Sequence, residues 1–108
     1  MRSMHATRPL PEPDVPPLGR SAAEQLSRTL RVVADPTRLQ LLSVILGSTQ
    51  RRATIGQLAD VLGLTQPTVT HHVRILVEDG VLVREQQGKF VWLSVREERR
   101  TAIEDLLR

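Results

Sequence analysis

The chain has 108 residues, 40% of them hydrophobic, no cysteine and a formal net charge of +3. At this length we expect one domain with a thin core, and the lack of thiols excludes disulfides and thiolate-bound metals. No apolar run reaches the roughly 18–20 residues that span a bilayer, so we expect a cytoplasmic chain without membrane contacts.

The first 20 residues differ in composition from the rest. They contain five of the 7 prolines and show no apolar periodicity. Such a segment has little apolar surface to bury, so residues 1–20 are predicted to form a disordered or extended arm. Periodic apolar patterns begin after this arm, and residues 21–108 are predicted to form the ordered domain.

Amphipathic runs predict five helices in this domain. They cover about 22–34, 36–46, 55–62, 66–79 and 97–107. The second of them is apolar on nearly every side, which predicts a central buried helix. Asp35 is a good N-cap for it, and Pro36 is tolerated in a first turn. Three pairs have the spacing of a capping box and mark helix starts: Ser21 with Glu24, Thr54 with Gln57, and Ser94 with Glu97.

After residue 80 the pattern becomes that of β-strands. Residues 81–85 and 90–93 are rich in β-branched and aromatic side chains. Residues 86–89 lie between them and include Gly88, which suits a hairpin loop. The predicted fold is therefore mainly α with one β-hairpin.

The helix 55–62, the turn 63–65 and the helix 66–79 have the spacing of a helix-turn-helix motif, whose second helix lies in the major groove of DNA. Val69, Val73 and Leu76 form the predicted buried stripe of this second helix. Its outward positions carry hydrogen-bonding side chains, namely Gln66, Thr68, Thr70, His71 and Arg74. No carboxylate interrupts them before Glu78, so we expect contacts to base edges and phosphates.

Two further features favour duplex DNA as the partner. The isoelectric point of about 10.9 suits a polyanion. Phe90 and Trp92 are the only aromatic residues, whereas proteins that read single strands stack bases on several rings. Arg84 and Lys89 are predicted to flank the tip of the hairpin, where they reach neighbouring phosphates or the minor groove.

Three segments strongly resemble the ArsR-type winged helix-turn-helix regulators. They are residues 34–42 (ADPTRLQLL), 55–59 (IGQLA) and 66–73 (QPTVTHHV). The resemblance runs from about Leu30 to Leu93. It implies a winged helix-turn-helix homodimer joined through the first and last helices, and an operator that is an imperfect inverted repeat. It also implies an inducer, often a metal ion, that releases the protein from DNA.

The apolar strips on the first and last helices agree with a dimer. We expect them to face outward and to be too apolar for the surface of a monomer, which predicts an isologous two-fold interface. The strips consist of Leu26, Leu30 and Val33 on one helix and of Ile103, Leu106 and Leu107 on the other.

The resemblance also implies metal sites that this chain lacks in their usual form. Thr54 and Gly56 stand where the family carries a pair of cysteines, and Arg99 replaces the first histidine of a second site. One nitrogen and oxygen site is conceivable for Ni(II) or Zn(II). Its candidate ligands are His5, Asp35, Glu97 and Glu98. His71 and His72 are poor ligands together, because adjacent helical residues point about 100° apart.

The sequence thus predicts a transcriptional regulator, not an enzyme, that binds duplex DNA sequence-specifically and acts as a repressor modulated by Ni(II), Zn(II) or another signal. An alternative is a protein-interaction module whose signal comes from a co-regulator protein, since no usual sensor site is visible. Catalysis is not expected, because there is no Gly-rich phosphate loop and no Ser/His/Asp constellation.

Overall fold

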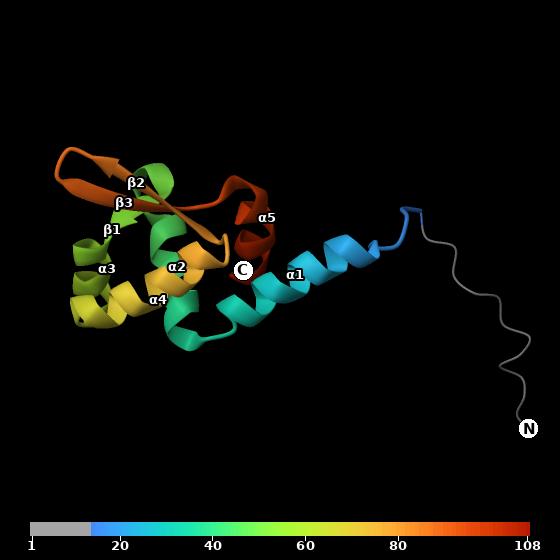
Figure 1. The fold of residues 1–108 in the computed structure, drawn as a ribbon, viewed down its shortest axis with the longest axis horizontal. Coiled ribbons are helices and arrows are strands. Elements are labelled where there is room, and N and C mark those ends of the chain that lie inside the picture. Colours follow the sequence, from blue (N-terminus) through green and yellow to red (C-terminus); the bar gives the residue numbers. More distant parts are fainter. Residues whose placement is uncertain (1–13) are drawn as a thin grey trace, which may run out of the picture.

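The computed structural model describes residues 14–108. Within this range five α-helices, one 3₁₀ turn and three strands follow one another (Figure 1). The elements are α1 (Arg20–Val33), α2 (Pro36–Gly47), η2 (Thr49–Arg51), β1 (Arg52–Thr54), α3 (Ile55–Leu62), α4 (Gln66–Glu78), β2 (Leu82–Gln87), β3 (Phe90–Val95) and α5 (Glu97–Leu106). This order confirms the predicted mainly-α fold with a β-hairpin wing. None of these helices is both long and apolar enough to cross a membrane.

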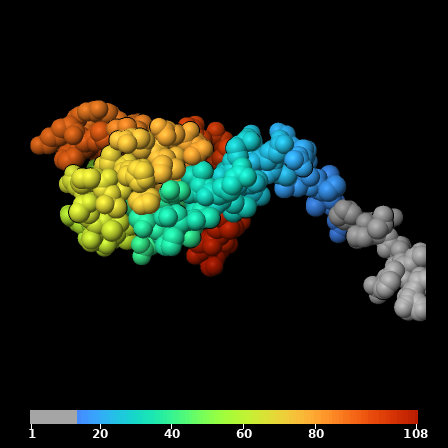
Figure 2. All heavy atoms as spheres, turned by 60° about the horizontal axis from the view of Figure 1, so that its bottom comes forward, coloured from blue at the N-terminus to red at the C-terminus, as the bar shows by residue number. Residues whose placement is uncertain are grey.

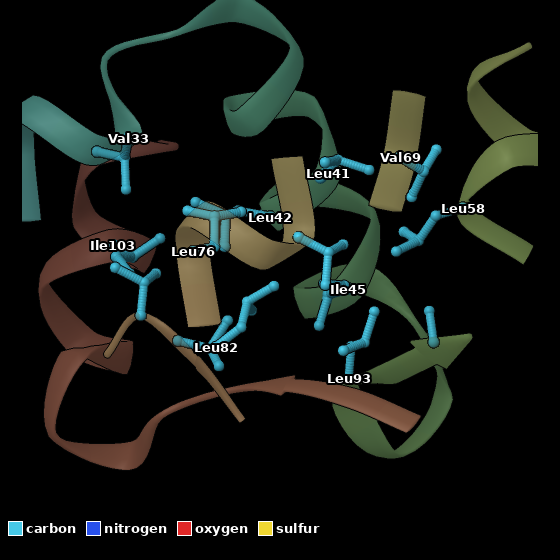
Figure 3. Packing of buried hydrophobic residues seen from close by; sticks show 14 of the residues in the cluster. Val33, Leu41, Leu42, Ile45, Leu58, Val69, Leu76, Leu82, Leu93 and Ile103 are labelled. Carbon is cyan, nitrogen blue, oxygen red and sulfur yellow. The ribbon is translucent and has the colours of Figure 1, made fainter. Parts of the chain in front are cut away.

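Helix α2 is the centre of the core, as its sequence predicts. Leu41, Leu42 and Ile45 are fully buried, and every other α-helix and strand of the domain contributes to the cluster around them (Figure 3). The surrounding side chains include Val33 of α1, Leu58 of α3, Val69 and Leu76 of α4, Leu82 of β2, Leu93 of β3 and Ile103 of α5. A helix that is apolar on nearly every side requires neighbours on most of its faces.

Side-chain caps define the starts of three helices. The Asp35 carboxylate accepts from the Arg38 backbone N–H at 3.0 Å and caps α2. Thr54 and Gln57 form the predicted capping box of α3, with backbone-to-side-chain distances of 3.0 and 3.2 Å. Thr65 accepts from the backbone N–H of Thr68 and caps α4. These three starts lie where the sequence places them.

The other two predicted capping boxes are wrong. Gly19 and Arg96 are the N-cap residues of α1 and α5, and neither makes a side-chain cap bond. Ser21 lies inside α1, because that helix begins at Arg20. Ser94 belongs to β3, where it pairs with Arg52 and Val83, so its backbone is part of the sheet.

The sheet has three antiparallel strands in the order β1-β3-β2. Strand β1 was not predicted; it has three residues, of which only Ala53 is buried, opposite Leu93. Strand β2 continues to Gln87, which pairs with Phe90. The predicted loop over 86–89 is therefore a two-residue turn at Gly88 and Lys89, with Gly88 at a φ of +62°.

The structure corrects the predicted dimer strips. Val33 and Ile103 are 2% and 0% exposed, because both side chains pack into the core of their own chain. Leu107 is partly buried against the same core. Leu26, Leu30 and Leu106 stay exposed. The N-terminal part of α1 projects from the body of the domain (Figure 2), so its apolar side chains have little cover within the chain.

Residues 1–13 of the predicted arm lie outside the described residues. Residues 14–19 form neither helix nor strand, and α1 begins at Arg20, the last residue assigned to the arm. The first helix thus starts two residues earlier than its periodicity predicts.

Candidate nucleic-acid interface

The turn between α3 and α4 sets the two helices of the motif against each other. Gly63 ends α3 in the left-handed conformation, at a φ of 66°, and Leu64 donates its backbone N–H to Ala59 at 3.0 Å. The Thr65 hydroxyl donates to the Thr68 hydroxyl at 2.9 Å and also caps the new helix. A chain that reverses over three residues in this way keeps α3 packed on α4.

Helix α4 divides cleanly into a buried and an exposed face. Val69, Val73 and Leu76 are buried, as predicted. Of the five predicted DNA-contacting residues, four are exposed (Gln66, Thr68, His71 and Arg74) and Thr70 is half-buried. A shallow hollow of about 500 Å³ is lined by Gln66, Pro67, Thr70, His71 and Arg74. No carboxylate lines it, so its polar surface suits an anionic partner.

The wing carries one cation at its tip and not two. Lys89 lies in the turn and is exposed, with its Nζ 5.8 Å from the centre of the Phe90 ring. Arg84 does not flank the tip as predicted. It pairs with Leu93, well before the turn-closing pair, because β2 is longer than its sequence pattern indicates.

Arg84 instead lies beside the start of α4. It lines a second shallow hollow of about 370 Å³ together with Gln66, Thr70 and Phe90. The hollow lies between α4 and the wing. Phe90 is 52% exposed there, and sequence reasoning gave this residue no role in binding.

A cation–π contact joins the wing to β1. The Arg52 guanidinium of β1 lies 4.0 Å from the centre of the Trp92 ring on β3 and donates to the Gln87 side chain at 2.9 Å. The three residues come from all three strands. This contact ties the hairpin to the rest of the sheet, and it was not predicted because β1 was not.

A second polar cluster lies behind α4. Arg38 donates from Nε to Nδ1 of His72 at 3.2 Å and from Nη1 to the backbone oxygen of Val32 at 2.8 Å. Asp35 Oδ2 lies 3.9 Å from the same His72 nitrogen. The pKa of Asp35 is lowered, mainly by the hydrogen bond from the Arg38 backbone N–H; partial burial opposes this, and the charge of Arg38 assists it.

The candidate metal ligands are not brought together. His5 lies outside the described residues. Asp35 caps α2, and Glu97 pairs with Arg100 at 2.9 Å. Between residues 14 and 108 no group of three or more His, Asp or Glu side chains is placed to hold a metal ion. This part of the chain therefore does not fit the metal that the family resemblance implies.

Comparisons with known proteins agree with this geometry. A family model described as a helix-turn-helix domain matches residues 33–85. The HTH-type transcriptional regulator NmtR of Mycobacterium tuberculosis is 30% identical, over 73% of this chain and 63% of that protein. A probable mercury resistance operon repressor of Streptomyces lividans is 36% identical, over 68% and 56%. The chain thus spans less than two thirds of the length of these two relatives.

Solved structures share the fold. The transcriptional repressor PagR of Bacillus anthracis superimposes with a TM-score of 0.73 at 24% identity, over 83% of this chain and 100% of that chain. An ArsR family transcriptional regulator, RHA00566, has a TM-score of 0.59 at 28% identity, over 79% of this chain and 84% of that chain. The likeness to PagR supports the winged-helix architecture alone.

The lowered pKa of Asp35 predicts a pH-dependent contribution to stability. Its folded-state pKa lies below its unfolded value, so the charged form stabilises the fold above about pH 4, and this stabilisation is lost as the pH falls through the folded pKa. Asp35→Ala should lower the free energy of unfolding by about 1 kcal/mol at pH 7 through loss of the cap. Asp35→Asn keeps a capping oxygen and should lose less.

Urea unfolding at pH 7 and pH 3 measures this effect. The difference between wild type and Asp35→Asn should be present at pH 7 and disappear towards pH 3. Asp60→Asn, an exposed position on α3, is the control and should leave stability unchanged at both values. An Asp35 difference that persists undiminished at pH 3 would contradict the role of the charge.

Proposed function

Because this chain belongs to the ArsR-type family of helix-turn-helix transcription regulators, we propose that it is a homodimeric repressor that reads an inverted-repeat operator in duplex DNA. The exposed face of α4 carries this proposal. Its hydrogen-bonding side chains lie beside the wing, on a helix whose start is fixed by the Thr65 cap. Together they offer donors and acceptors of suitable length for base edges in a major groove.

Within this interface we assign different roles to different side chains. Gln66 and Arg74 are the base readers, because amide and guanidinium groups make bidentate bonds to adenine and guanine. Thr68, Thr70 and His71 contact phosphates or bases beside them. Arg84 acts next to Gln66 instead of at the wing tip, since both line one hollow. Lys89 reaches the phosphates that flank the half-site.

A dimer supplies the second half-site. After the correction for buried residues, the apolar side chains left exposed on α1 and α5 are Leu26, Leu30 and Leu106, at 38%, 39% and 49%. An isologous interface that covers them would relate two α4 helices by a two-fold axis. An inverted repeat is the DNA counterpart of that symmetry.

For the signal we propose nitrogen and oxygen chemistry, since the sequence contains no cysteine. Residues 14–108 hold no group of three or more metal ligands, so we propose His5 as the first ligand of a Ni(II) or Zn(II) ion. If the protein binds no metal ion, an organic ligand or a co-regulator protein would have to carry the signal.

The first test is DNA binding and its specificity. Wild-type protein should shift duplex DNA from the promoter region of its own gene, or a duplex selected from a random pool. Gln66→Ala and Arg74→Ala should each cost roughly 1–3 kcal/mol on the cognate duplex and less on random DNA. Lys89→Ala should weaken both alike and lower the slope of log K against log salt by about one.

Gln40→Ala removes an exposed glutamine of α2 that lines neither hollow, and it should bind as wild type does. Equal losses on cognate and random DNA for Gln66→Ala and Arg74→Ala would assign those side chains to phosphates. A wild-type protein that shifts no duplex would refute the proposed function.

The dimer is tested by charge in the exposed strips. Leu30→Asp combined with Leu106→Asp should give a monomer in light scattering that no longer shifts operator DNA, because buried carboxylates would oppose the interface. Val61→Asp places the same charge on an apolar residue of α3 that is 65% exposed. This control should remain dimeric. A dimer of wild-type affinity in the double variant would place the interface elsewhere.

The metal proposal is tested by calorimetry with Ni(II) at pH 7.5 in a buffer that does not chelate. Wild type should bind, and His5→Ala should bind at least several-fold more weakly, because an imidazole ligand is lost. Binding that His5→Ala leaves intact would exclude His5. No binding to wild type would exclude a metal signal of this kind.

A further inference from the structure

The polar cluster behind α4 joins three helices through one side chain. The Arg38 guanidinium bonds the backbone oxygen of Val32 in the last turn of α1 and Nδ1 of His72 on α4, while Arg38 itself belongs to the first turn of α2. A cation at the C-terminus of α1 also interacts favourably with the carbonyl groups of the last turn, which have no partner within the helix. Arg38 thus connects the helix proposed for dimerisation to the helix proposed for DNA recognition.

The cluster is partly buried. The His72 side chain is 16% exposed, and the Asp35 side chain beside it is 33% exposed. Hydrogen bonds to a charged group in such surroundings are stronger than bonds at an open surface. The Arg38 guanidinium is part-buried and already bonded to Val32 and His72, so we assign it no contact with DNA.

Apolar packing alone leaves the rotation of α4 loosely defined. The buried stripe of Val69, Val73 and Leu76 holds the helix against the core, but apolar burial has no preferred direction, so it defines the rotation of α4 less sharply than a hydrogen bond does. With side chains about 6 Å from the helix axis, a turn of about 10° moves a base-reading atom by about 1 Å. That displacement is enough to break a hydrogen bond to a base edge.

We propose that Arg38 is a positioning residue that sets the rotation of α4 by holding His72, and so determines how well the protein discriminates its operator. The inference rests on the proposed function. In sequence His72 follows the exposed His71 and precedes the buried Val73, so its ring lies at the boundary between the exposed and the buried face of α4. A hydrogen bond to this ring restrains the rotation of α4 about its axis. Because the same guanidinium holds the end of α1, a displacement of α1 is passed to α4.

The guanidinium is required for this geometry. Two of its nitrogens bond two different helices in one planar group, and a lysine ammonium at the same position cannot match both directions. Arg38→Lys therefore keeps the charge but removes the bridge. His72→Phe keeps a ring of similar size but removes the acceptor. His72→Asn keeps an acceptor oxygen close to the position of Nδ1.

The test compares these variants on cognate and random duplexes. Arg38→Lys and His72→Phe should each lower cognate affinity roughly tenfold. The double variant should lose no more than the worse single variant, because both changes remove the same bond. Affinity for random DNA and the salt slope should stay at wild-type values, since no phosphate contact is lost. His72→Asn should restore most of the cognate affinity.

The melting temperature and the molar mass of each variant are measured alongside, and Arg31→Lys, an exposed position in the last turn of α1, is the matched control. It should match wild type on both duplexes. Additive losses in the double variant, or equal losses on cognate and random DNA, would overturn the positioning role. If wild type binds and all variants bind equally well, the inference fails while the proposed function stands. A wild type that binds no DNA would refute the proposed function first.

Discussion

The structure depends on the cover of one apolar helix. Helix α2 buries Leu41, Leu42 and Ile45 completely, and Leu39, Val44 and Leu46 on its other sides are partly buried against the same core. A domain of this size has few apolar side chains, so all the other α-helices and strands contribute to that cover. Helix α4 gives one face to it, the sheet gives Leu82 and Leu93, and α5 gives Ile103. The surfaces that remain exposed on these elements are those left over for partners.

The local starts of helices could be predicted because their chemistry is local. The caps at Asp35, Thr54 and Thr65 act over three residues, and the left-handed Gly63 needs only its own missing side chain. Local sequence patterns do not predict the structure where it is determined by a partner that is distant in sequence. Ser94 has the spacing of a cap, yet it pairs with Arg52 in the sheet, and β1 exists only because β3 passes beside it.

The same distinction separates the parts of the candidate site. Periodicity identifies the outward side chains of α4, since the buried stripe can be read from the spacing of Val69, Val73 and Leu76. Periodicity does not show which apolar residues of α1 and α5 pack into the core of their own chain and which stay exposed. Val33 and Ile103 were therefore predicted to lie in the dimer interface, although both are buried in the core. Nor does periodicity find Arg38 and His72, which lie 34 residues apart and meet only after folding.

Apolar burial and directional bonds therefore have different tasks in this protein. Burial around α2 supplies stability, but it has no preferred direction. We propose that the orientation of α4 and of the wing depends on a few polar contacts at their edges. These contacts are the Thr65 cap at the start of α4, the Arg38 bridge at His72, and the Arg52 contact with Trp92 in the wing. Each joins segments that come from different elements. If the proposed Arg38 bridge positions α4, a signal that displaces α1 can alter the presentation of α4 by disturbing this bridge while the core remains intact.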